Sequence, residues 1–89
     1  MKEKKITVKN KLGLHARAAA KVVTLTNGFK SVVKIRNGDK AADAKSIMKL
    51  LMLSAPKGTE LIISADGKDE KNAIKCLADL IENKFNENE

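Results

Sequence analysis

The stretch SVVKIRNGDKAA, residues 31–42, carries the clearest local pattern in the sequence and sets the expected fold. Residues 31–36 follow the period of two and the β-branched composition that are typical of a strand with one buried face. Asn37-Gly38 comes next, and this dipeptide suits the positive backbone angles of a tight hairpin turn. We therefore expect a short strand near Lys40 to Ala42 to pair back along residues 31–36.

Upstream of this hairpin, the sequence predicts one strand and one helix. Residues 5–9, KITVK, alternate apolar with polar side chains, as a half-buried strand does. After a loop at residues 10–13, a set of small and apolar side chains recurs at helical spacing. Asn27-Gly28 is expected to end this helix in a left-handed conformation. The recurring side chains are Ala16, Ala19, Ala20 and Val23.

Downstream of the hairpin, the sequence predicts a helix, a strand and a second helix. Ser46 can accept a hydrogen bond from the unpaired amides of a helix over residues 47–53, which gives about two turns. Residues 61–65, LIISA, should form the strand, and Asp69 or one of its neighbours should cap the last helix. Residues 86–89 are expected to fray. The apolar stripe of the last helix consists of Ile74, Leu77, Ala78, Ile81 and Phe85.

The element order is therefore βαββαβα, an α+β fold whose helices cover one face of the sheet and leave the other in solvent. A chain of 89 residues can close one hydrophobic core but not two, so we expect a single domain over residues 1–89. No apolar run approaches the roughly 20 residues of a membrane span, and residues 1–5 lack the apolar core of a signal peptide. We expect a cytoplasmic protein.

Composition narrows the classes of partner. Cys76, the only cysteine, has neither a partner for an internal disulfide nor neighbours that suggest a metal site. Basic residues outnumber acidic ones by 18 to 11, and the formal charge of +7 favours anionic partners or serves solubility. The chain has no Trp or Tyr and only two Phe, so it lacks the usual base-stacking side chains. We expect no metal and no nucleic acid, and a basic nucleic-acid-binding domain is the weakest alternative.

His15 is the only histidine, and it lies where a glycine-containing loop meets the expected start of the first helix. First-turn amides lack internal partners and, with the helix dipole, favour a bound phosphate. The same positive end favours an uncharged imidazole whose lone pair can attack phosphorus. Arg17 can offer its guanidinium to the phosphate oxygens, and the backbone of Ala16 and Arg17 can bind them. From position alone, a solvent-facing cap is the more common role of such a histidine.

Three sequence motifs favour a functional role for His15 over a purely capping one. They are GLHAR at residues 13–17, AKSIM at 44–48 and KGTELIISADGKDE at 57–70. Together they closely resemble HPr, the histidine-containing phosphocarrier family of the bacterial phosphoenolpyruvate-dependent sugar phosphotransferase system. The resemblance runs through essentially the whole chain. It implies a two-layer open-faced β-sandwich, in which three helices pack on one face of a four-stranded antiparallel sheet.

The same resemblance implies a function. His15 would be phosphorylated on its pros nitrogen, Nδ1, by the phosphoenolpyruvate-dependent first enzyme and would donate to the A domains of sugar permeases, with assistance from Arg17. The protein would be a phosphoryl carrier with a covalent phosphohistidine intermediate and no cofactor, and not an enzyme. Ala18 stands where the family usually has proline. Because alanine is a good helix former, we expect a changed transfer rate or phosphohistidine lifetime but retained activity.

Ser46 has two interpretations. Its chemistry favours a helix cap worth about 1 kcal/mol. The resemblance adds that AKSIM matches the setting of the serine that an ATP-dependent serine kinase/phosphorylase modifies in many Gram-positive relatives. A phosphoserine would put negative charge beside Ile47 and Met48 and would discourage docking of acidic partners. This supports an alternative in which the chain is mainly a regulatory, phosphoserine-dependent partner of a catabolite-control transcription factor.

The second helix is too apolar for a single buried stripe. A two-turn helix on a sheet buries one face, so Ile47, Met48 and Leu51 should remain as an exposed patch that docks partner proteins together with Leu14. Neighbouring lysines would steer acidic partners toward it. We expect this interface to be small and transient and the protein to be a monomer.

Overall fold

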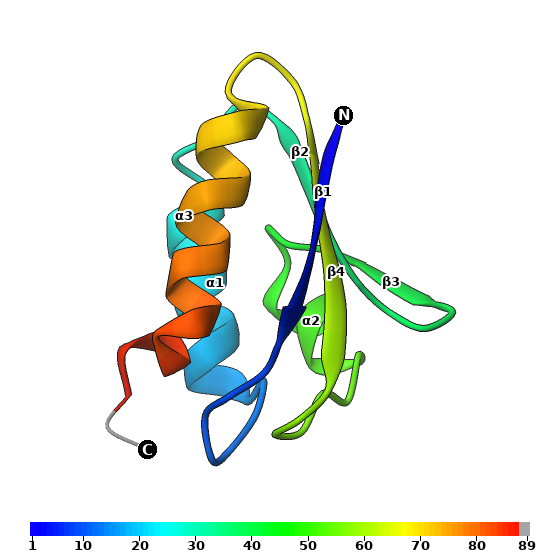
Figure 1. Ribbon diagram of the computed structural model, residues 1–89, viewed down its shortest axis with the longest axis vertical. Helices are drawn as coiled ribbons and strands as arrows, with labels where there is room; N and C mark the ends of the chain where they lie inside the picture. Colours follow the sequence, from blue (N-terminus) through cyan, green and yellow to red (C-terminus); the bar gives the residue numbers. More distant parts are fainter. Residues whose placement is uncertain (88–89) are drawn as a thin grey trace.

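The order of the elements is the predicted βαββαβα, followed by a short 3₁₀ helix (Figure 1). The computed structural model describes residues 1–87. Within that range, no helix is both long and apolar enough to cross a membrane. The elements in chain order are β1 (Lys2–Thr7), α1 (Ala16–Thr26), β2 (Val32–Asn37), β3 (Lys40–Asp43), α2 (Ile47–Leu51), β4 (Glu60–Asp66), α3 (Glu70–Glu82) and the 3₁₀ helix η1 (Lys84–Asn86).

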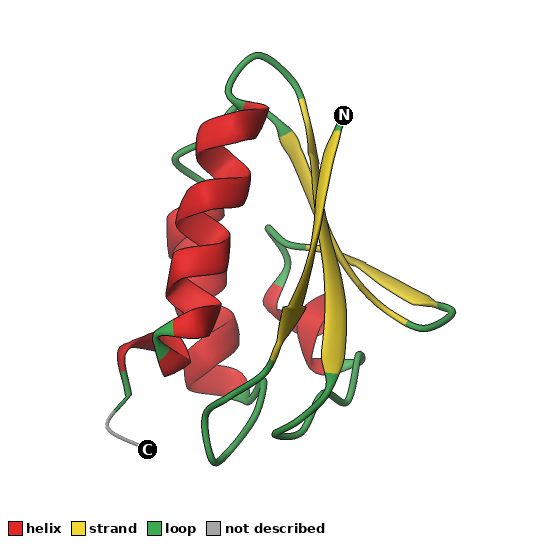
Figure 2. Cartoon of the chain, in the orientation of Figure 1, coloured by secondary structure: helices red, strands yellow, loops and turns green. Residues whose placement is uncertain are grey.

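The four strands form one sheet in the order β1-β4-β2-β3, and every neighbouring pair is antiparallel. The two long helices, α1 and α3, lie side by side against one face of the sheet (Figure 2), and α2 packs against α1 and β3. The register sets apolar residues opposite one another, since Ile35 pairs with Ile63 and Val33 with Ala65. The expected α+β fold with a four-stranded antiparallel sheet is therefore confirmed.

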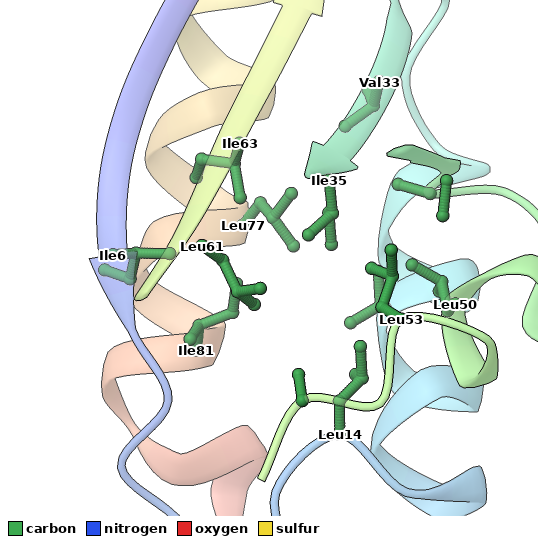
Figure 3. Close-up of a cluster of buried hydrophobic side chains, with 14 of the residues drawn as sticks. Ile6, Leu14, Val33, Ile35, Leu50, Leu53, Leu61, Ile63, Leu77 and Ile81 are labelled. Carbon is green, nitrogen blue, oxygen red and sulfur yellow. The ribbon is translucent and has the colours of Figure 1, made fainter. Parts of the chain in front are cut away.

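The hydrophobic core fills the space between the sheet and the helices (Figure 3). Ile35 and Ile63 of the sheet meet Leu77 of α3, and Leu50 of α2 lies in the same core. All four side chains are fully buried, and each such burial is worth about 1.5–3 kcal/mol. The predicted stripe of the last helix is confirmed for four of its members, which are buried on α3: Ile74, Leu77, Ala78 and Ile81. The fifth, Phe85, is buried but was wrongly placed on this helix, because α3 ends at Glu82 and Phe85 lies in η1 with a positive φ.

Two predictions about α1 were wrong. The helix ends at Asn27 with φ of −62°, a right-handed conformation, and not in a left-handed one. The amides of Gly28 and Phe29 donate to the carbonyls of Leu25 and Thr26, which satisfies the end of the helix without a left-handed residue. The buried stripe also begins two residues later than Ala16, because α1 packs against α2 and α3. Its members are Ala18, Ala19, Val22 and Thr26.

The ends of the elements also differ from the predicted ones. Asn37 pairs with Lys40, so the hairpin loop consists of Gly38 and Asp39, and only Gly38 has a positive φ. That pattern is typical of a type II′ turn. β1 starts at residue 2 and not at 5. α2 ends at residue 51, before the predicted 53, because Leu53 turns into the core.

Asp69 lies at the cap position of α3, as predicted, but its side chain makes no cap hydrogen bond. Its carboxylate accepts hydrogen bonds instead from the Ser31 hydroxyl, the Lys30 amide (2.8 Å) and the Ser31 amide (3.0 Å). The bond from the Ser31 hydroxyl and that from the Lys30 amide lower the pKa of Asp69 below its usual 3.8. Asp69 therefore ties the start of α3 to the segment that enters β2.

Candidate functional site

The loop before α1 is held against the segment between α2 and β4. The Leu14 amide donates to the Ala55 carbonyl at 2.8 Å, and Gly13 has φ of +70°. A Cβ atom at Gly13 would lie 2.4 Å from the Ala55 carbonyl oxygen, so this position requires glycine. The loop turns the side chain of Leu14 into the core (Figure 3), where only 7% of the residue is exposed. The prediction that Leu14 docks partners is therefore wrong, because Leu14 anchors the loop.

His15 is the N-cap residue of α1, the position that the sequence predicts. Its backbone is extended, with φ of −96° and ψ of −179°, and its Nδ1 accepts a hydrogen bond from the Arg17 amide at 3.3 Å. About a quarter of the side chain, 24%, is exposed. An Nδ1 that accepts carries no proton, so this contact assigns the lone pair of Nδ1 to the side that faces the first-turn amides.

The other ring nitrogen of His15 contacts a carboxylate that the sequence analysis missed. Nε2 lies 2.8 Å from Oε2 of Glu87, and Oε1 of Glu87 accepts a hydrogen bond from Nδ2 of Asn10 at 3.0 Å. Burial alone would raise the pKa of Glu87, but the hydrogen bonds from Asn10 and His15 outweigh it, so this pKa lies below the usual 4.5. A neutral ring with its proton on Nε2 satisfies both contacts at once.

The residues just after α3 bring Glu87 to His15. Phe85 is fully buried, and the Lys21 ammonium donates to its carbonyl at 2.6 Å. Lys84, Phe85 and Asn86 all have φ between 56° and 61°, which turns the chain sharply after α3. The prediction of fraying is wrong for residues 86 and 87, and residues 88–89 lie outside the described part. The apolar stripe that ends at Phe85 was the only feature of the sequence that indicated the burial of Phe85. Nothing in that stripe indicates that Glu87 contacts His15.

Ala16 and Arg17 form the exposed first turn of α1, next to the ring of His15. Across residues 1–87, the Arg17 guanidinium has no ion pair or hydrogen bond, so it can move toward an incoming anion. Ala18 follows in the same turn and is fully buried. The turn therefore combines backbone amides, a mobile cation and the Nδ1 lone pair at one place, which is the arrangement that phosphoryl transfer needs.

Other nucleophiles and metal ligands are sparse. Cys76 on α3 is half-buried and forms no disulfide with the described residues. No group of three or more His, Cys, Asp or Glu side chains in residues 1–87 is arranged to hold a metal ion. His15 is thus the strongest candidate nucleophile in the part of the chain that the structure describes.

Ser46 caps α2, as predicted from its chemistry. Its Oγ accepts a hydrogen bond from the Lys49 amide at 3.3 Å, and the residue is half-buried. The following helix exposes apolar side chains, as the sequence predicts. The exposed fractions are 40% for Ile47, 73% for Met48 and 36% for Leu51. The sequence analysis missed four further exposed apolar side chains, which are Met1, Leu12, Val32 and Met52.

Comparisons with known proteins agree with this geometry. Residues 2–83 match the family described as "PTS HPr component phosphorylation site". The chain is 45% identical over 87 residues to the phosphocarrier protein HPr of Xylella fastidiosa, and the match covers 98% of each chain. A solved HPr structure from Thermoanaerobacter tengcongensis has a TM-score of 0.95 and 46% identity and covers both chains completely.

A third relative carries catabolite repression in its name. Crh, the catabolite repression containing protein of Bacillus subtilis, was solved as a dimer with a swapped domain. It is 39% identical with a TM-score of 0.76, over 94% of this chain and 97% of the other. The family match spans most of the chain, and the relatives match it over nearly their full length. The chain therefore belongs to the HPr family, the phosphocarrier proteins of the phosphotransferase system.

Proposed function

We propose that His15 is the residue of this phosphocarrier that bears the phosphoryl group and that the group is bound through Nδ1. The observation that carries this proposal is the direction of the Nδ1 lone pair, which faces the first-turn amides of α1. Nδ1 attacks phosphorus on the donor, the Nδ1–P bond forms, and the bond between phosphorus and the donor's nucleophile breaks with its electron pair. Donation to the next carrier is the reverse step.

Arg17 and the amides of Ala16 and Arg17 supply the positive charge and the donors. The equatorial oxygens of the transferring group carry most of its charge, and backbone N–H groups at a helix start stabilise them without reorganising. The Arg17 guanidinium is exposed beside them and can follow the group as it moves. The chain thus needs no deep pocket, because alignment and charge neutralisation supply most of the catalysis.

The proposed donor is the phosphoenolpyruvate-dependent first enzyme of the system, and the proposed acceptors are the A domains of sugar permeases. Ile47, Met48 and Leu51 form the docking surface, and the exposed Lys49 steers acidic partners. Lys45 contributes less to steering, because its ammonium donates to the Phe29 carbonyl at 2.8 Å. The interface is small, which suits a carrier that must release each partner.

The same helix supports a regulatory role for Ser46. Its hydroxyl lies directly before the exposed Ile47 and Met48, so a phosphate there would add nearly two negative charges at the docking surface. This modification, by a serine kinase/phosphorylase, would slow uptake at His15. The similarity to Crh favours a second candidate function, in which the phosphoserine form binds a catabolite-control transcription factor.

We further propose that residues 1–89 form a single cytoplasmic HPr-like domain that acts as a monomer. The described residues share one continuous core, which supports a single domain. The swapped dimer of Crh provides the contrasting assembly. Sedimentation at micromolar concentration distinguishes the two, since a swapped dimer has twice the mass of the monomer.

The test of the main proposal is incubation with phosphoenolpyruvate and the first enzyme, followed by mass measurement. The wild-type chain should gain one phosphate, which acid treatment should remove. His15→Ala should gain none and should keep the circular dichroism of the wild type. An acid-stable phosphate, or labelling of His15→Ala, would refute the assignment of the phosphoryl group to His15.

A further inference from the structure

We infer that Glu87 is a positioning residue for phosphoryl transfer, and that it holds the His15 ring and stabilises the ring's charge after phosphorylation. This inference rests on the proposed function of His15. The observation behind it is the bridge that one carboxylate makes, with Oε2 at 2.8 Å from His15 Nε2 and Oε1 at 3.0 Å from Asn10 Nδ2. Only 13% of the Glu87 side chain is exposed, so water competes weakly for it.

The bridge is built into the fold. Asn10 is fully buried and also donates to the Gly13 carbonyl at 2.7 Å. The loop before α1 therefore holds the Asn10 side chain in place, and this side chain in turn holds Glu87. Phe85 holds the other side, because its buried ring anchors the chain two residues before Glu87. The carboxylate is therefore clamped between the first loop and the last turn of the described chain.

The bridge also determines which nitrogen of His15 can react. A carboxylate at Nε2 accepts a hydrogen bond from an N–H there, and a neutral ring with its proton on Nε2 must carry its lone pair on Nδ1. The Arg17 amide lies on that side. A buried carboxylate that orients a catalytic imidazole from its far nitrogen acts in the same way in the Ser-His-Asp triad.

The carboxylate gains importance when phosphorus is bound. When Nδ1 donates its lone pair to phosphorus and Nε2 keeps its proton, the ring gains one positive charge and no proton leaves. Glu87 lies 2.8 Å from the N–H that carries part of this charge, so it stabilises the phosphorylated ring more than the neutral ring. On donation, the electron pair of the N–P bond returns to Nδ1, and the ring leaves as neutral imidazole.

The substitution Glu87→Gln tests this bridge sharply. Two donors, the N–H of His15 and the amide of Asn10, converge on the two carboxylate oxygens. A glutamine has one oxygen and one NH₂ group, so it can accept from only one of the two donors and carries no charge. Glu82→Gln is the matched control, because Glu82 is exposed and its ion pair among residues 1–87 is with the exposed Lys4 at 3.9 Å.

The measurement is the equilibrium of phosphoryl exchange between the chain and the first enzyme. We expect Glu87→Gln to lower this equilibrium constant about tenfold, the factor expected for one charge-assisted hydrogen bond. Glu87→Asp should recover part of the loss, and Glu82→Gln should match the wild type. Nitrogen-15 NMR of the unphosphorylated ring should show a slowly exchanging Nε2 proton in the wild type and a fast-exchanging one in Glu87→Gln.

The outcomes separate this inference from the function on which it rests. If the wild type takes up no phosphate at His15, the proposed function fails whatever Glu87 does. If every variant is labelled at His15 but Glu87→Gln equals Glu82→Gln in both the equilibrium and the NMR spectrum, the positioning role of Glu87 is refuted and the function stands.

Discussion

The starts of α1 and α2 have the same local chemistry but very different surroundings. In each, a side chain accepts a hydrogen bond from an amide of the first turn, His15 from Arg17 and Ser46 from Lys49, both at 3.3 Å. The remaining nitrogen of His15 is held by Glu87, 72 residues away in sequence. Among the described residues, the hydrogen bonds of Ser46 all lie within its own segment, residues 43–50.

On the proposed function, the two caps differ in tertiary support, because distant segments hold the cap at His15 and, within residues 1–87, only local residues hydrogen-bond to the cap at Ser46. A cap contributes stability through one local hydrogen bond. At α1, distant segments also fix the orientation of the ring and expose Nδ1 beside Arg17. At α2, the cap leaves a hydroxyl next to an apolar patch, which suits modification and recognition. The predictions below test this contrast, in order of decreasing expected effect.

The largest effect, a loss of stability, is expected from Gly13→Ala, which disrupts the loop before His15. The new Cβ would meet the Ala55 carbonyl at 2.4 Å in a left-handed conformation, so we expect the free energy of unfolding to fall by about 3 kcal/mol. Urea denaturation measures it. Gly38→Ala is the control, because Gly38 shares the positive φ but has nothing within 4 Å, and about 1 kcal/mol is expected. Equal losses would show that the contact with Ala55 is unimportant.

Arg17→Ala should slow phosphoryl transfer to His15 by about 100-fold, because one preorganised charge on the moving phosphoryl group is removed. Rapid-quench measurement of uptake from the first enzyme gives the rate. Arg36→Ala provides a matched control, since Arg36 is the other arginine and lies exposed on β2. A similar loss in both variants would indicate a general effect of charge on docking and would remove the specific role of Arg17.

Variants of Ser46 should separate the effect of losing the helix cap from the effect of adding negative charge at this position. Ser46→Ala should cost about 1 kcal/mol of stability and leave uptake at His15 unchanged, because only the cap to Lys49 is lost. Ser46→Asp should keep stability, since Asp is also a good N-cap, and should slow uptake several-fold by repelling acidic partners. Thermal unfolding and the uptake rate together check both. An unchanged uptake rate in Ser46→Asp would contradict the regulatory proposal.

The smallest effect concerns acid stability. The pKa of Glu87 and that of Asp69 lie below their usual 4.5 and 3.8, so both groups stabilise the fold when ionised. This stability is fully present above those usual values and is lost as the pH falls through the lower folded-state pKa values. The melting temperature should therefore fall on acidification below about pH 4.5. Glu87→Gln and Asp69→Asn should each flatten this dependence, and parallel curves for wild type and both variants would contradict it.

The features of the fold and the site that were predicted correctly share one property, which is that they depend on residues close together in the sequence. Alternation over residues 31–36, the stripe from Ile74 to Ile81 and the capping chemistry of Ser46 all depend on spacing within a few residues. The cap position of His15 belongs to the same class. Leu14 was misassigned because its direction depends on the contact with Ala55, and the buried face of α1 was misassigned because it depends on packing against α2 and α3.

By itself, the amino-acid sequence determined the order of the elements and the histidine at the start of α1, because periodicity and capping are short-range properties of the chain. The family followed from the resemblance carried by residues 13–17, 44–48 and 57–70. Only the tertiary structure decided that Leu14 faces inward and that Glu87 contacts both Nε2 of His15 and Nδ2 of Asn10. A bond between residues 72 positions apart leaves no local pattern. It exists because the buried Phe85 and the loop at Gly13 bring the residues after α3 and the loop before α1 to one helix start.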